Sequence, residues 1–204
     1  MDQSNNFFEN VYKNVDKDNL VSIPWANLVA NAHLVDYLNV KDDMSYGRAL
    51  VIGCGLGDDA DALAKMGYEV DAIDISQTAI RMAKERFPTE SIDFRVEDIF
   101  KLPASMFAAY DFVFESRTIQ SLDPKFRDEL IEIIAGLLAK GGELLVHTNI
   151  QNDNENYGGP PWPLYRRELL GFEKYGLKVQ HQNEEMINKP VASYDAVVHY
   201  KKQA

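Results

Sequence analysis

Short apolar runs alternate along the chain with segments whose apolar residues recur at helical spacing. The runs typical of strands cover residues 49–52, 69–73, 92–96, 110–114 and 143–148. Helical patterns lie between them, including residues 77–87, which Ser76 precedes as a cap, and residues 124–139, which Pro124 opens. Strands that alternate with helices form a parallel sheet with helices on both faces. We therefore expect an α/β fold of the Rossmann-like, doubly wound kind.

The two ends of the chain depart from this alternation. Residues 177–186 and 194–201 read as closing strands joined by a connection too short for a crossover, so the last strand of a seven-stranded, mainly parallel sheet should be antiparallel. Near the start, Ser22 is placed to begin a helix whose apolar face runs from Trp25 to Leu38. We expect residues 1–44 to form an N-terminal helical cap segment and residues 45–204 a cofactor-binding core, within one domain.

The stretch 48–74 has the form of a β-α-β unit that holds a nucleoside-bearing cofactor. The first apolar run meets a glycine-rich turn with Gly53, Gly55 and Gly57, and the second apolar run ends in Asp74. Glycines let the backbone turn sharply and pass close to a ligand, and an acid at the end of the second strand accepts hydrogen bonds from ribose hydroxyls. A tight turn without any ligand is the simpler alternative.

The spacing of the glycines favours S-adenosylmethionine (SAM) over NAD as the cofactor. The pattern is G-x-G-x-G, whereas the dinucleotide fingerprint G-x-G-x-x-G would place its third glycine one residue later, where Asp58 stands. Cys54, within the turn, is the single cysteine of the chain, so no intrachain disulfide is possible. We interpret it as a small apolar residue packed under the turn rather than as a nucleophile.

Composition and charge narrow the class of partner. The net charge of -11 and the isoelectric point near 4.8 disfavour a nucleic-acid substrate, because an acidic surface repels phosphate backbones. The first residues lack the basic start and apolar run of a signal peptide, and no apolar stretch reaches the length of a membrane span. We expect a cytoplasmic protein that binds a small molecule, not a membrane.

Together the glycine turn, the acids after the second and third strands and the closing strand pair resemble the class I SAM-dependent methyltransferases over residues 45–204. The resemblance implies that the glycine turn, with Cys54 inside it, faces the methionine part of SAM. It implies that Asp74 binds the ribose and that Ile75 packs on the adenine. It also implies that Asp98, flanked by Glu97 and Ile99, meets the adenine amino group, and that Glu115 lies beside the methyl donor.

Within that family the chain most resembles enzymes of small soft nucleophiles, the thiopurine, thiol and tellurite-resistance methyltransferases. The shared features are small size, an acidic surface, a Trp-bearing N-terminal segment and a loop with Trp and Pro. The N-P-P-Y type motif of nucleobase methyltransferases is absent, and residues 115–118 read E-S-R-T instead. The Asp-Asn pair of the metal-dependent catechol enzymes is also missing, so we predict no metal.

The methyl acceptor is less defined than the cofactor. A thiolate needs little help from a base, whereas a hydroxyl or protonated amine needs one within reach. His147 and His33 are candidates for that base, with a structural role as the alternative for each. Arg117 could bind an acceptor carboxylate or phosphate, or pair with Glu115 or Asp123. Three aromatic residues are candidates for lining an apolar pocket that binds the acceptor: Trp25, Tyr157 and Trp162. Packing in the core is the alternative for each.

Three functions therefore stay open from the sequence. The first is a SAM-dependent methyltransferase of a small molecule, possibly a thiol or other soft nucleophile. The second is an NAD-dependent oxidoreductase. The third is a cofactor-fold protein without catalysis that binds a partner. The sequence identifies neither the methyl acceptor nor the oligomeric state.

Overall fold

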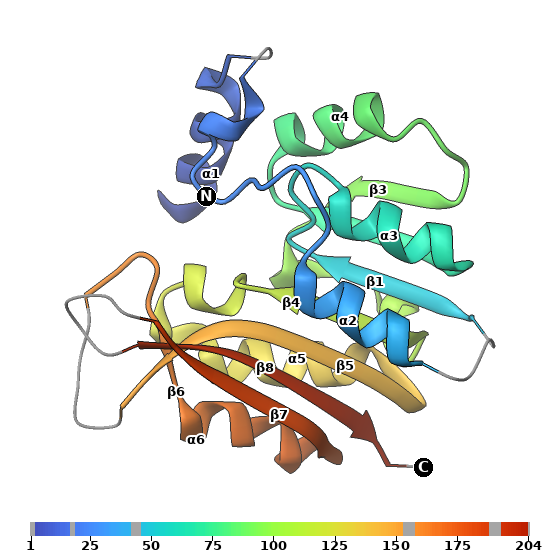
Figure 1. Ribbon diagram of the computed structural model, residues 1–204, viewed down its shortest axis with the longest axis vertical. Helices are drawn as coiled ribbons and strands as arrows, with labels where there is room; N and C mark the ends of the chain where they lie inside the picture. The colour runs from blue at the N-terminus through green and yellow to red at the C-terminus, as the bar shows by residue number, and fades with distance from the viewer. Residues whose placement is uncertain (1–2, 17–18, 42–45, 153–157, 188–192, 204) are drawn as a thin grey trace. The chain divides into compact units, whose positions relative to one another are not determined.

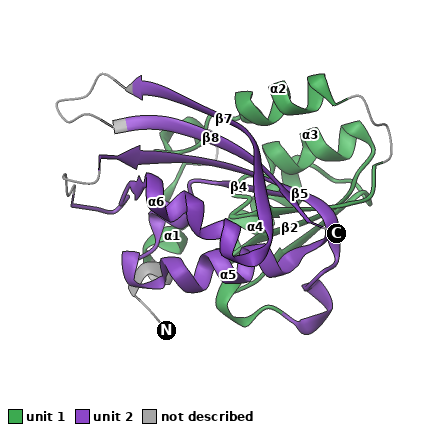
Figure 2. Cartoon of the chain, turned by 90° about the horizontal axis from the view of Figure 1, so that it is seen from below, with its two compact units in different colours: residues 1–102 green, residues 103–204 purple. Residues whose placement is uncertain are grey.

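The computed structural model describes residues 3–16, 19–41, 46–152, 158–187 and 193–203. The chain divides into two compact units, residues 1–102 and 103–204, shown in different colours in Figure 2. Each unit carries its own strands and helices and is described by itself. The expected boundary near residue 45 stays a prediction.

The first unit is built on three parallel strands, β1 (Arg48–Ile52), β2 (Glu69–Asp74) and β3 (Ile92–Val96), in the order β3-β2-β1. Leu50 pairs with Asp71, and Asp74 pairs with Val96. All but the first residue of β1 and of β2 are buried, which is typical of parallel strands covered on both faces. The apolar runs of the sequence therefore became strands as expected.

Two helices connect these strands. α3 (Asp58–Met66) packs on β1 and β2, and α4 (Gln77–Arg86) packs on β2 and β3. Ser76 caps α4 as expected: its hydroxyl accepts a hydrogen bond from the amide of Ala79 at 3.0 Å. α3 ends at Gly67, whose φ of 105° is the left-handed conformation that glycine adopts without strain.

The N-terminal segment differs from its expected form. The predicted helix from Ser22 is wrong: a 3-10 turn (Leu20–Ser22) ends there, and α2 (Ala32–Val40) begins only after Asn31, whose side chain accepts from the amide of His33. Leu28, with φ of 56°, breaks any continuous helix through Trp25. An unpredicted helix, α1 (Gln3–Asn14), instead packs beside α4 (Figure 1).

The second unit carries a mixed sheet in the order β4-β5-β8-β7. Its strands are β4 (Tyr110–Ser116), β5 (Leu138–Gln151), β7 (Leu177–Ile187) and β8 (Ser193–Lys202). β4 and β5 are parallel, while β8 is antiparallel to both β5 and β7. The expected antiparallel last strand is confirmed. A two-residue strand that was not predicted, β6 (Leu164–Tyr165), pairs with the end of β5.

Helices of the second unit follow β4 and β6. α5 (Arg127–Leu137) begins after a 3-10 turn at Pro124–Phe126, and a second 3-10 turn, Ile119–Ser121, lies just past β4. The expected helix from residue 164 to 175 divides into α6 (Arg166–Leu169) and a 3-10 segment (Leu170–Tyr175). The mainly parallel α/β fold class is confirmed. Among the described residues, none of the helices combines the length and apolarity that a membrane crossing requires.

Candidate functional site

The glycine turn of the first unit has the sharp backbone turn that its sequence predicted. Gly53, Gly55 and Gly57 have φ values of 65°, 52° and 90°, all in the left-handed region. The amide of Cys54 donates to the carbonyl of Ile73 at 2.9 Å, which ties the turn to the end of β2. Burial raises the pKa of the Cys54 thiol well above its usual range, which supports a packing role rather than a nucleophilic one.

Asp74 lies at the end of β2 directly beside this turn. Its carboxylate accepts from the amides of Gly55 at 3.0 Å and Ser76 at 2.8 Å, one on each oxygen. Burial raises its pKa, while hydrogen bonds from Ser76, Gly55 and Ile75 act in the opposite direction. Three amides occupy three of the about four lone-pair directions of a carboxylate. Asp74 therefore retains the capacity for one further donor, such as a ribose hydroxyl.

Tyr12 of α1 covers the turn, a contact that sequence reasoning missed. A Cβ atom on Gly55 would lie 3.0 Å from the Tyr12 hydroxyl. That hydroxyl accepts a hydrogen bond from Nε1 of Trp25 at 2.8 Å, and the two rings meet edge to face. Burial and the charge of Asp74 raise the pKa of Tyr12, so its hydroxyl keeps its proton. Residues 1–20 are polar and have no apolar periodicity that would predict the contact of Tyr12 with the glycine turn.

Two ionic side chains hold these elements in place. Glu9 of α1 accepts from the hydroxyl of Ser76 at 2.6 Å and from the amide and hydroxyl of Thr78 at 3.1 and 2.9 Å. Burial raises the pKa of Glu9, but these hydrogen bonds outweigh it and lower the pKa to about 2. Arg86 of α4 donates to the carbonyl of Leu56 and to both carboxylate oxygens of Asp58.

The residues expected at the adenine lie at the ends of β2 and β3. Asp98 caps a 3-10 turn (Ile99–Lys101) by accepting from the amide of Phe100 at 3.1 Å, and it pairs with Lys101 at 3.0 Å. The amide of Glu97 donates to the carbonyl of Asp74, which joins the two strand ends. Ile75 is half-buried. Asp98 thus has a capping role in the structure, and its contact with adenine stays a prediction.

This arrangement fits a nucleoside-bearing cofactor in the first unit. The turn offers exposed backbone at Gly53, and Asp74 offers an acceptor with spare capacity. The close approach of Tyr12 to Gly55 shows that any larger residue at position 55 would be both strained and crowded. The residues that sequence reasoning assigned to the ribose and the methionine part therefore lie together.

In the second unit Glu115 is fully buried at the end of β4. One oxygen accepts from the amides of Thr118 at 2.6 Å and Ile119 at 2.9 Å, and among the described residues the other has no hydrogen-bond partner. Burial raises the pKa of Glu115 to about 7 in spite of the two amide bonds. The side chain thus holds the turn after β4, and its assigned place beside the methyl donor is untested.

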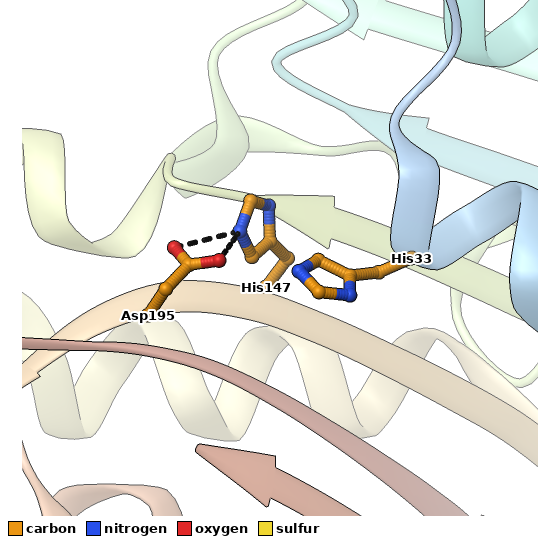
Figure 3. Close-up of side chains that lie close together, drawn as sticks. All are labelled: His33, His147 and Asp195. Carbon is orange, nitrogen blue, oxygen red and sulfur yellow. Dashed lines mark hydrogen bonds and ion pairs between the residues drawn. The ribbon is translucent and has the colours of Figure 1, made fainter. Parts of the chain in front are cut away.

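His147, Arg117 and two residues not singled out from the sequence form one polar cluster. His147 Nε2 lies 3.0 Å from both carboxylate oxygens of Asp195 (Figure 3), and Nδ1 lies 3.1 Å from the Ser116 hydroxyl. Arg117 binds Asp195 at 3.0 Å, which replaces its expected alternatives Glu115 and Asp123. The backbone of Arg117 has a φ of 62°, which is rare for residues other than glycine. Two catalytic candidates therefore share one carboxylate.

The segment around Trp162 is held by buried polar groups. The Trp162 amide donates to the carbonyl of Gln120 at 2.6 Å, and its carbonyl accepts from Arg127 at 2.6 Å. Arg127 is buried and pairs with Glu168 at 2.6 Å. Tyr157 lies outside the described residues. His33 lies in the first unit near the start of α2 and is half-buried.

A family model and several relatives of similar sequence match this chain. Residues 18–203 match the family model described as thiopurine S-methyltransferase. A probable thiol methyltransferase 2 of Arabidopsis thaliana is 35% identical over 153 residues, which is 70% of this chain and 64% of that protein's length. A thiopurine S-methyltransferase of Legionella pneumophila (strain Corby) is 25% identical over 193 residues, 82% of this chain and 86% of that protein.

Solved structures of similar fold include methyltransferases. The magnesium protoporphyrin IX methyltransferase of Synechocystis PCC 6803 with bound SAM has a TM-score of 0.72 at 13% identity, covering 100% of this chain and 99% of that one. TehB from Haemophilus influenzae has a TM-score of 0.70 at 20% identity, covering 92% and 67%. The expected class of SAM-dependent enzymes is confirmed, which disfavours the NAD-dependent alternative. By its fold, its glycine turn and its match over nearly the whole length, this chain belongs to the thiopurine S-methyltransferase family.

Proposed function

We propose that this protein transfers a methyl group from SAM to a small soft nucleophile, with a thiol as the first candidate. SAM, when bound, supplies an electrophilic methyl group on a sulfonium. The observation that carries the proposal is the pairing of the left-handed glycine turn with Asp74, since this acceptor retains capacity for a hydroxyl donor. The relatives described as thiol and thiopurine methyltransferases support the choice of acceptor.

The chain's own residues are proposed to bind and orient both molecules. Asp74 would hold the ribose, while Gly53 and Gly55 would let the backbone approach the methionine part. Trp25 bonds to Tyr12 beside the turn, which supports a place near the cofactor as well as its expected place at the acceptor. Arg117, with its side chain about half exposed, would bind an anionic group of the acceptor.

A thiolate acceptor makes the transfer mainly a matter of positioning and exclusion of water. With an acceptor that is already ionised, replacing His147 or His33 by Gln should therefore leave most of the rate. Small-molecule binding, a cytoplasmic location and the absence of nucleic-acid or membrane partners complete the proposal.

Calorimetry with SAM and NAD, followed by a screen for release of S-adenosylhomocysteine (SAH), tests this function. We expect SAM to bind and NAD not to bind. Asp74→Ala should weaken SAM binding about 10- to 100-fold, because a hydrogen bond to a charged group contributes about 1.5–3 kcal/mol. Asp71→Ala is the matched control: it lies on the same strand and is similarly buried, but it pairs with Arg48 and Arg95.

Thiols, thiopurines, halides, phenols and amines form the acceptor panel. Release of SAH with thiols or thiopurines supports the proposed acceptor class. Binding of NAD in place of SAM would refute the function at its root, and SAH release confined to amines would refute the acceptor class alone.

A further inference from the structure

The polar cluster at the end of β4 has the connectivity of a proton relay. Ser116 pairs with His147 in the parallel β4–β5 ladder, and Asn149, two residues further along β5, pairs with Asp195 across the antiparallel β5–β8 ladder. Side chains two residues apart on a strand share one face. The two ladders therefore bring a hydroxyl, an imidazole and a carboxylate from three strands to the same face of the sheet.

The hydrogen bonds fix the direction in which a proton can move. A carboxylate only accepts, so in the neutral imidazole the ring proton is assigned to Nε2 of His147, the nitrogen that faces Asp195. The other nitrogen, Nδ1, is then an acceptor, and the Ser116 hydroxyl donates to it. A hydroxyl oxygen carries two lone pairs, so Ser116 Oγ can accept a proton while it donates its own.

A proton relay needs a buried base and an outer group that a ligand can reach, and the exposure of His147 and Ser116 differs in this sense. His147 is 5% exposed, whereas Ser116 is half-buried and stands at the carboxyl end of β4. Ligands of open α/β sheets bind at the carboxyl ends of the strands. The next residue, Arg117, is held at a positive φ by a hydrogen bond from its amide to the carbonyl of His147 at 2.8 Å. Strained backbone of this kind gathers at functional sites.

We propose that Ser116, His147 and Asp195 accept the proton of a methyl acceptor that is not yet ionised, which extends the acceptor class from thiolates to aliphatic thiols and phenols. This inference rests on the proposed function. In the step, the X–H bond of the acceptor breaks and its electron pair stays on X. The proton passes to Ser116 Oγ while the Ser116 hydroxyl proton passes to Nδ1 of His147.

The charges in this step balance. Ser116 ends unchanged, His147 becomes an imidazolium, and the negative charge of Asp195 stabilises it while X carries the electron pair that forms the bond to the methyl carbon. Arg117 also binds Asp195 and so competes with the imidazolium for its charge.

The activity test compares two acceptors that differ in ionisation near neutral pH. Thiophenol is largely ionised, whereas 2-mercaptoethanol is not. We expect His147→Gln and Ser116→Ala each to lower kcat/KM for 2-mercaptoethanol about 100-fold, the lower range for loss of general base catalysis. The same variants should change kcat/KM for thiophenol less than about threefold. His199→Gln is the matched control, because His199 is another sheet histidine bound to a carboxylate, that of Glu143 at 3.1 Å.

A second readout needs no methyl donor. The ionised form of 4-nitrophenol absorbs visible light, so its absorbance on binding reports proton transfer to the protein. The wild-type protein and His199→Gln should raise the ionised fraction of bound 4-nitrophenol, and Ser116→Ala and His147→Gln should not. Ser116→Ala removes a single oxygen atom and so keeps the test valid if His147→Gln does not fold.

The outcomes separate the two proposals. Equal losses on thiophenol and 2-mercaptoethanol, or equal ionisation of 4-nitrophenol in all proteins, would overturn the relay while SAH release by the wild-type protein upholds the proposed function. No SAH release from any acceptor by the wild-type protein would overturn the proposed function itself.

Discussion

Replacing Glu115 by Gln should remove a specific part of the pH dependence of stability. The carboxyl is fully buried, and its pKa in the folded protein is raised from 4.5 to about 7 by that burial. Between these values the folded protein holds a proton that the unfolded chain has released. Stability due to this group is therefore complete below about pH 4.5 and is lost as the pH rises through 7.

The magnitude follows from the two pKa values. Each unit of pKa difference corresponds to about 1.4 kcal/mol, so the interval from 4.5 to about 7 amounts to about 3 kcal/mol of unfolding free energy. The side chain introduced by Glu115→Gln keeps an oxygen for the amides of Thr118 and Ile119. It puts an amide group where Glu115 has an oxygen without a partner among the described residues. That change costs about 1–3 kcal/mol, equally at every pH.

Urea unfolding followed by circular dichroism, at intervals from pH 4.5 to 8, measures the effect. The unfolding free energy of Glu115→Gln, relative to wild type, should rise by about 3 kcal/mol across this range. Glu129→Gln makes the same change of charge at an exposed position of α5 and should follow the wild type. Parallel curves for Glu115→Gln and wild type would refute the reasoning, because they would mean that Glu115 titrates alike in both states.

Three further predictions concern the cofactor pocket and the segment around Trp162. Asp98→Ala should weaken SAM binding in calorimetry with little loss of unfolding free energy; equal affinity would leave Asp98 as a capping residue alone. Trp162→Ala should raise the KM of the acceptor while the Kd of SAM changes little, and the reverse pattern would place Trp162 at the cofactor. Arg127→Met should lower the unfolding free energy by about 3–5 kcal/mol, because it breaks a buried ion pair and removes the hydrogen bond to the carbonyl of Trp162. Arg166→Met, which breaks the more exposed pair with Glu184, should cost less than about 1 kcal/mol, and equal losses in urea unfolding would contradict the assigned burial.

The sequence by itself determined the strands, the glycine turn and the cofactor class. These features are local, since the apolar runs, the glycine spacing and the acid after the second strand lie within about 25 residues of one another. The β1-turn-α3 unit and Asp74 therefore stand where the pattern predicted them. The antiparallel last strand was also predictable, because a short connection permits no crossover.

The tertiary structure alone decided which distant side chains meet. Tyr12 reaches Gly55 because α1 packs beside α4, and no local pattern in residues 1–20 marks that packing. The N-terminal helix was misplaced because the apolar spacing from Trp25 to Leu38 mimics a helix that the positive φ of Leu28 interrupts. His147 acquires its partners from the registers of two strand pairs, which join residues 31 and 48 positions apart. Such registers depend on the whole sheet. The local sequence around His147 therefore could not predict its contacts with Ser116 and Asp195.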